Sequence, residues 1–197
     1  PLTLGAEFVP LQVSDGVTAT SGTVVSGIAV VGLGPVTASA RLGTTPLGFF
    51  DTPRLMWRGA LNGIIAGDFF AELETTRAPV TDSTTSWLGG VTDTWISGKL
   101  IYSPHAQYGV LGRFGEATSD EIGVLPWEQA MVWGIWPVQE DERFTLSAWG
   151  EGMALLHDRQ SDSFTAGDAG MFSPRGYYAA AGRLVGDWRS ADDILGL

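Results

Sequence analysis

The sequence predicts an all-β fold, either a sandwich, a jelly roll or a barrel of about a dozen short strands. Glycine and proline are frequent, with 27 and 10 residues, and they are spread evenly among many Thr, Val and Ser residues, which is typical of short strands joined by tight turns. Several segments alternate apolar and polar residues with the period of a strand. We expect an extended N-terminal arm over 1–13, a single β domain over 14–189 and a C-terminal docking segment over 190–197.

The stretch Leu125–Glu151 is expected to form the middle of the sheet, because it contains Trp127, Trp133, Trp136 and Trp149 of the eight tryptophans. Residues 130–136 are almost all apolar and precede Pro137, which predicts a strand that is buried on both faces and stops at the proline. Residues 143–149 alternate instead, and Trp149 falls on their more polar side. Trp149 and Trp127 are therefore candidate binding residues.

In the N-terminal half, Leu2–Val13 has apolar residues interrupted by Pro10 and is expected to be the docking arm, with Phe8 as a contact residue. The alternation and the glycine and proline breaks after it predict short strands at Val24–Val31, Val36–Leu42, Arg54–Gly59, Leu61–Ile65 and Phe69–Thr75.

Further along the chain, turn residues around Pro104 predict a hairpin of Thr94–Ser103 and Gln107–Phe114. Later strands are expected at Met153–Leu156 and, in preference to a helix, at Tyr177–Val185. Ser190 can cap a short last helix, because a serine oxygen accepts from free backbone N–H groups at a helix start. Leu195 on this segment is a second candidate docking contact.

The composition excludes several classes of function. The net charge is −11, so the basic footprint of a nucleic-acid-binding protein is missing. The chain has no cysteine, which excludes disulfides and thiolate metal sites. No window approaches eighteen consecutive apolar residues, and Pro1–Leu4 lacks the features of a signal peptide, so we expect neither a transmembrane helix nor a membrane partner.

Catalytic patterns are weak. Glu72 and Glu74 are spaced i, i+2 on one strand face, and Glu151 lies between two glycines, so these are the carboxylates a glycoside hydrolase would use. The length and tryptophan content are similar to those of the family-11 xylanase jelly roll, but the aromatic residue expected after Glu151-Gly152-Met153 is missing. We expect solvated carboxylates and no enzyme.

The two histidines, His105 and His157, are accompanied by neither a G-x-S-x-G nor an H-E-x-x-H motif. Asp158, Asp162 and Asp168 lack the spacing of a calcium loop. The sequence therefore predicts no catalytic residue, no metal site and no cofactor.

Two glycine-punctuated segments, Asp15–Gly27 and Gly167–Gly186, resemble strands of tailed-phage virion proteins, especially capsid decoration and other head or tail surface proteins. The resemblance implies a non-enzymatic, homo-oligomeric β protein in the virion that binds a capsid or tail surface and other virion proteins. The alternatives are a carbohydrate-binding protein that uses exposed aromatic residues, for example on a host-surface glycan, and a jelly-roll glycoside hydrolase.

Overall fold

The described part of the chain folds into ten β-strands, which confirms the all-β class. The structure is a computed structural model that describes residues 1–14, 19–45, 54–80, 86, 89–120, 123–141, 143–158 and 175–188. The strands are β1 (Leu2–Ser14), β2 (Ala19–Leu33), β3 (Val36–Thr44), β4 (Leu55–Ala66), β5 (Phe69–Pro79), β6 (Thr92–Tyr102), β7 (Gln107–Ser119), β8 (Gly123–Glu140), β9 (Phe144–His157) and β10 (Gly176–Trp188).

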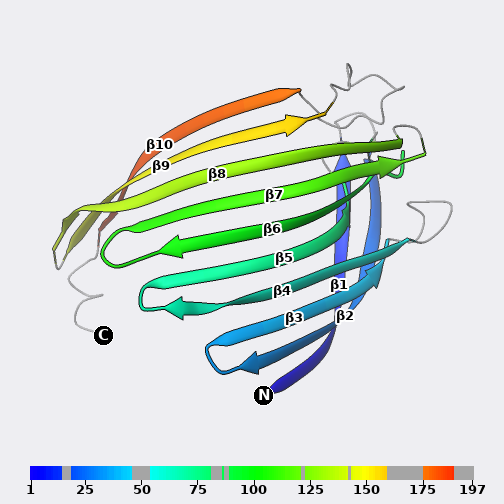
Figure 1. Ribbon diagram of the computed structural model, residues 1–197, viewed down its shortest axis with the longest axis horizontal. Helices are drawn as coiled ribbons and strands as arrows, with labels where there is room; N and C mark the ends of the chain where they lie inside the picture. Colours follow the sequence, from blue (N-terminus) through cyan, green and yellow to red (C-terminus); the bar gives the residue numbers. More distant parts are fainter. Residues whose placement is uncertain are drawn as a thin grey trace.

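All ten strands belong to one antiparallel sheet in which each strand pairs with the next in the chain (Figure 1). β1 and β10 are the two edges, and the sheet is not closed within the described residues. Two hairpins use two-residue loops whose first residue is a glycine with positive φ, 69° at Gly34 and 49° at Gly67. Such loops match the twist of the strands they join, and glycine adopts this φ without steric cost.

The strands are longer than the sequence predicts. The residues expected to form a docking arm are β1, which pairs with β2 over its whole length, from Leu2↔Val31 to Ser14↔Ala19. The expected stop at Pro137 is wrong, because β8 continues to Glu140 and absorbs the proline at a register shift between Pro137 and Gln139. A bulge can accommodate a residue that cannot donate to the ladder.

Two pairs of predicted strands each merge into one strand. The expected break at Gly59–Ala60 lies inside β4, and the break at Gly150–Gly152 lies inside β9. The hairpin predicted around Pro104 is confirmed as β6 and β7. The predicted helix from Ser190, with Leu195, lies outside the described residues.

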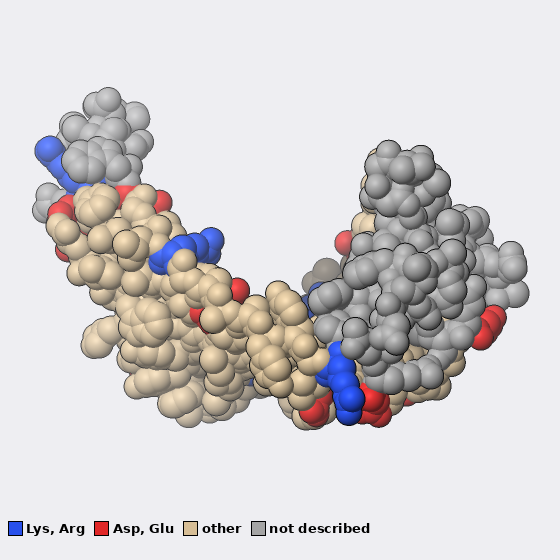
Figure 2. Space-filling view, turned by 90° about the horizontal axis from the view of Figure 1, so that it is seen from above, with Lys and Arg blue, Asp and Glu red and all other residues tan. Residues whose placement is uncertain are grey.

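The sheet is strongly curved. Figure 1 shows β1 and β2 crossing behind the other strands, and Figure 2 shows a hollowed, U-shaped profile. A cavity on the hollow side is lined by Val9 and Val24 from β1 and β2 and by Met56 and Arg58 from β4, so these side chains face one another across the curve. We call their side of the sheet the inner face and the opposite side the outer face.

Few hydrophobic side chains are buried. In the described residues the buried apolar side chains are Met56, Ala60, Val91, Ala117 and Leu125. Three of them form one cluster with Val80 at one end of the sheet: Val91, Ala117 and Leu125. Most large apolar residues of the strands are exposed, which is the reverse of the arrangement in a water-soluble domain with a central core.

The turn between β8 and β9 is held by Asp141. Its Oδ1 accepts hydrogen bonds from the backbone N–H groups of Arg143 (2.9 Å) and Phe144 (2.8 Å), and these bonds, in that order, lower the pKa of Asp141 from its usual value. A lowered pKa means that the carboxylate stabilises the turn above its unfolded-state pKa, about 3.9, and that this contribution is lost as pH falls through the folded-state value.

We therefore expect the β8–β9 turn to loosen in acid below about pH 4. The amide proton shifts of Arg143 and Phe144, followed by NMR from pH 6 downwards, should report this titration. Asp141→Asn keeps an acceptor oxygen without a titrating proton, so the acid-dependent shift should disappear in that variant. Equal titration in both proteins would contradict the assignment.

Candidate functional site: the two faces of the sheet

The outer face is apolar across all ten strands. One transverse row, read through the strand register, runs from Leu61 through Leu73, Gly98, Gly112, Ala130 and Ala154 to Tyr178. Large side chains on this face are strongly exposed, with Leu73 at 60% and Val132 at 57%. Figure 2 shows mostly uncharged residues over the convex side of the molecule. The apolar surface therefore continues from β1 to β10 instead of forming isolated patches.

Charged side chains reach the outer face of the described strands only near one end. Arg77, Thr94, Glu116 and Pro126 are register partners on β5 to β8, and Glu128 is two residues further along β8. The guanidinium of Arg77 lies 5.5 Å from the ring centroid of Trp57, also on the outer face. The apolar surface thus has a polar boundary at this end.

Aromatic side chains mark the opposite boundary. Phe69 stacks on Tyr102 at a centroid distance of 4.5 Å, and Tyr108 meets Trp136 edge-on at 6.0 Å. Trp136 Nε1 donates to the Tyr108 hydroxyl at 3.1 Å. Phe69 and Arg77 are eight residues apart on β5, so the two boundaries are about 27 Å apart along the strand at 3.4 Å per residue.

The inner face is polar at the same level of the sheet. The row next to that of Leu61 contains Asn62, Glu72 and Lys99, and Lys99 Nζ lies 3.0 Å from Glu72 Oε1. Arg58 pairs with Glu74 through two contacts to Oε2, of 2.7 and 3.0 Å. Adjacent residues of one strand therefore lie in opposite environments, with charged pairs on one side and exposed leucines on the other.

The inner-face network continues onto the other strands. Arg113 donates to Gln129 Oε1 at 3.2 Å, and Trp127 Nε1 donates to Asp93 Oδ1 at 2.7 Å. Near the N-terminus, Arg41 pairs with Glu7 and donates to Ser26 Oγ at 2.9 Å. These contacts join strands side by side and hold the polar side chains over the concave surface.

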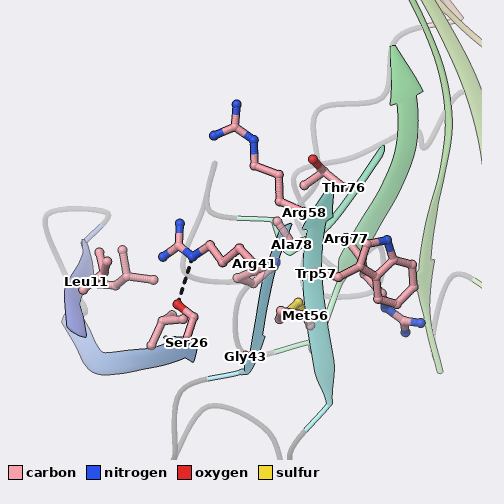
Figure 3. Close-up of a pocket in the computed structure, with 13 residues that line it drawn as sticks. Leu11, Ser26, Arg41, Gly43, Met56, Trp57, Arg58, Thr76, Arg77 and Ala78 are labelled. Atoms are coloured by element: carbon pink, nitrogen blue, oxygen red, sulfur yellow. Dashed lines mark hydrogen bonds between the residues drawn. The ribbon is translucent and has the colours of Figure 1, made fainter. Parts of the chain in front are cut away.

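The curve of β1 and β2 encloses a cavity of about 240 Å³ against β3 to β5. In Figure 3, Arg41 and Arg58 point towards the side of Leu11 and Ser26, whereas Trp57 and Arg77 point the other way. Both inner arginines already have carboxylate partners, which are Glu7 and Glu74. The cavity is therefore a neutralised part of the inner face, and its lining is mostly apolar.

The binding residues named from the sequence are distributed between the faces. Trp149 and Trp127 lie half-buried on the inner face, and the guanidinium of Arg183 lies 4.7 Å from the Trp149 ring centroid. Phe8 is 67% exposed on the outer face of β1. Leu195 lies outside the described residues. The structure thus brings Trp149 and Trp127 onto one surface and separates Phe8 from them.

The candidate catalytic carboxylates do not form a pair. Glu72 is paired with Lys99 and Glu74 with Arg58 and Thr76, so each is held in its own cross-strand contact. Glu151 lies on β9, in register with Trp133 and Ala181. Because two free carboxylates across a cleft are needed for glycoside hydrolysis, Glu72 and Glu74 are better described as structural ion pairs.

The histidines are at opposite ends of the sheet. His105 is exposed in the β6–β7 turn, and His157 is 8% exposed at the end of β9. Within the described ranges, no three His, Asp or Glu side chains lie close enough to hold a metal ion. In the same part of the chain, no helix is long and apolar enough to cross a membrane.

The continuous apolar outer face is the feature that the sequence analysis did not predict. Its signal is present, because the strands carry small or apolar residues at most alternate positions, as in Leu2, Leu4, Ala6 and Phe8 of β1. A scan against models of protein families found no match to this chain, and a search of curated proteins found none either. The function therefore has to be inferred from the two faces.

Proposed function

We propose that this sheet is embedded in a lipid bilayer, with the outer face against hydrocarbon chains and the inner face lining a water-filled space. In this role the sheet separates lipid from water, and the protein is not an enzyme. The observation that carries the proposal is the continuous apolar outer face, with rows such as Leu61–Leu73 exposed directly behind ion pairs such as Glu72–Lys99. In water such a surface would drive aggregation.

The dimensions of the outer face support the proposal. Membrane-spanning strands carry an apolar band about 25 Å tall between girdles of aromatic residues, and they alternate apolar and polar side chains. The band from Phe69 to Arg77 is about 27 Å long on β5, or about 21 Å tall at the tilt of 35–45° that such strands have, which is close to this height. The aromatic group of Phe69, Tyr102, Tyr108 and Trp136 lies at one of its boundaries. All described strands have at least 9 residues, which is enough to span the hydrocarbon when tilted.

Backbone hydrogen bonding sets a further requirement. Inside a bilayer every N–H and C=O group needs a partner within the protein. The outer edges of β1 and β10 pair with no other described strand. We therefore propose that β1 and β10 each hydrogen-bond to a further strand when the sheet is in the bilayer.

The membrane proposal departs from the expectation drawn from the sequence, which rested on the absence of a helix-length apolar run. A membrane-spanning strand does not contain a run of consecutive apolar residues, because every second residue points to the opposite, polar face. The virion structural protein stays a second candidate. The edges of β1 and β10, which pair with no other described strand, and the apolar outer face are surfaces on which other virion proteins would pack.

Quenching by brominated lipids tests the proposal. The full chain is refolded with phosphatidylcholine vesicles whose acyl chains carry bromine, which quenches only indoles that contact hydrocarbon. We expect strong quenching from Trp57 and Trp136 on the outer face, so Trp57→Phe and Trp136→Phe should each reduce the quenched fraction. Trp127→Phe on the inner face is the matched control and should leave it unchanged.

Two results would contradict the membrane proposal. One is a folded chain that stays in the supernatant when vesicles are sedimented. The other is quenching that is equal for inner and outer tryptophans. A lipid-free assembly of defined size by light scattering, with the outer-face tryptophans protected from iodide, would favour the virion candidate instead.

A further inference from the structure

Among the residues that the structure describes, four tryptophans lie on the inner face in two groups. Trp95 and Trp127 are separated only by Gly115 in one transverse row of the sheet. Trp133 and Trp149 are diagonal neighbours on β8 and β9, because Trp149 is in register with Ile135. Trp127 and Trp133 are six residues apart on β8, so the groups are about 20 Å apart along the strand.

Two of these indoles lie flat on the sheet. A Cβ atom added at Gly115 would lie 2.6 Å from Trp127 Cε2, and one added at Gly109 would lie 1.9 Å from Trp133 Cζ2. The indoles therefore occupy the space directly over the two glycines. Both rings cover backbone on the inner, concave face of the sheet. Trp127 is fixed in this position by its hydrogen bond to Asp93.

Hydrogen-bonding side chains flank both groups. Arg113 and Gln129 lie in the row adjacent to Trp127, and Arg113 donates to Gln129 Oε1 at 3.2 Å. At the second group, Glu151 is the register partner of Trp133, and Arg183 lies over Trp149. Each aromatic surface thus has a carboxylate, an amide or a guanidinium next to it.

We propose that the inner face binds an extended oligosaccharide. A sugar ring presents weakly positive C–H groups that stack on the electron-rich face of an indole, while its hydroxyls need donors and acceptors at the rim of the ring. The indoles over Gly115 and Gly109 and the polar side chains beside them supply both, and at the second group Arg183 covers one face of Trp149. Two groups about 20 Å apart along one strand suit a chain of several sugars better than a single one. Nucleic acid, which also stacks on indoles, is disfavoured by the net charge of −11.

This inference rests on the proposed function only in requiring that the inner face meets water. The test uses the full chain in detergent micelles, with maltohexaose, cellohexaose and chitohexaose as probes in isothermal titration calorimetry. We expect binding of at least one of the three. We expect Trp127→Ala and Trp149→Ala each to weaken it at least tenfold.

The controls separate binding from folding. Trp136→Ala on the outer face should bind as the parent chain does. Trp127→Phe keeps a ring over Gly115 and should bind more weakly than the parent but more tightly than Trp127→Ala. No binding of any probe, or binding unchanged in both inner-face alanine variants, would overturn the inference. The quenching of Trp57 and Trp136 by brominated lipids is measured in a separate experiment. Loss of sugar binding with normal quenching would contradict only the sugar site, and loss of quenching would contradict the membrane proposal.

Discussion

Leu61→Lys is expected to prevent stable insertion of the chain into a bilayer, whereas Asn62→Lys, one residue further along β4, is expected to be tolerated. Leu61 is 49% exposed in the middle of the outer face, between Ala38 and Leu73. A lysine on the lipid side of a membrane-spanning strand costs about 2–4 kcal/mol near the midplane. Asn62 lies on the inner face in register with Glu72, where an added positive charge meets water and a carboxylate.

The comparison is sharp because lipid and water around the outer face predict losses of stability of very different size. If the outer face met water, a lysine at a half-exposed position would change stability by no more than about 0.5 kcal/mol. The measurement is urea unfolding of both variants and the parent chain in phosphatidylcholine vesicles, followed by tryptophan fluorescence. Equal midpoints for Leu61→Lys and the parent chain would reject a lipid-facing outer surface. A loss in Asn62→Lys equal to that in Leu61→Lys would also reject it.

The strands with clear alternation could be predicted from the sequence. Phe69–Thr75 and the hairpin of Thr94–Ser103 and Gln107–Phe114 are found as β5, β6 and β7, because period-2 alternation and turn chemistry are local properties. The ends of the strands could not be predicted in the same way. Pro137 was expected to stop a strand, but β8 passes it at a register shift that is fixed by pairing with β9.

The length of β9 is also underestimated from the sequence, because of its two glycines. One strand is expected to end at Trp149 and the next to begin at Met153, but Gly150 and Gly152 between them lie on the outer face of β9, opposite Gly134 and Val132. In the sequence alone, a glycine between two apolar segments predicts a turn or an interruption of the strand. In the folded sheet the same glycine can be an interior strand residue that a neighbouring strand or an indole covers. The role of such glycines depends on pairing across the sheet, which is not visible in a single segment.

The candidate site was only partly accessible from the sequence. Trp149 and Trp127 could be selected for their type and their strand, and both lie on the inner face. Their relation to Gly109, Gly115 and Asp93 depends on the register of β6 to β8. The outer face was missed because alternation alone does not tell which of the two faces meets water.

The second large effect is expected at Gly63, on the outer face where β4 passes the β2–β3 turn. A Cβ atom there would lie 2.3 Å from the carbonyl oxygen of Pro35 and 2.9 Å from Val36 Cα, so backbone has to move. We expect Gly63→Ala to destabilise the sheet by about 1–3 kcal/mol, the usual cost of overpacking. Unlike a flexible side chain, the Pro35–Val36 backbone cannot rotate away, because Val36 begins β3.

Gly98→Ala is the matched control, because Gly98 also lies on the outer face and its Cβ would meet only Leu73 Cδ2 at 3.7 Å, an ordinary contact. Alanine there should leave stability unchanged or raise it by up to about 1 kcal/mol, since a strand glycine loses more backbone freedom on folding. Urea unfolding midpoints of the two variants give the comparison. If Gly63→Ala unfolds at the same midpoint as Gly98→Ala, β4 does not pass the β2–β3 turn at this distance.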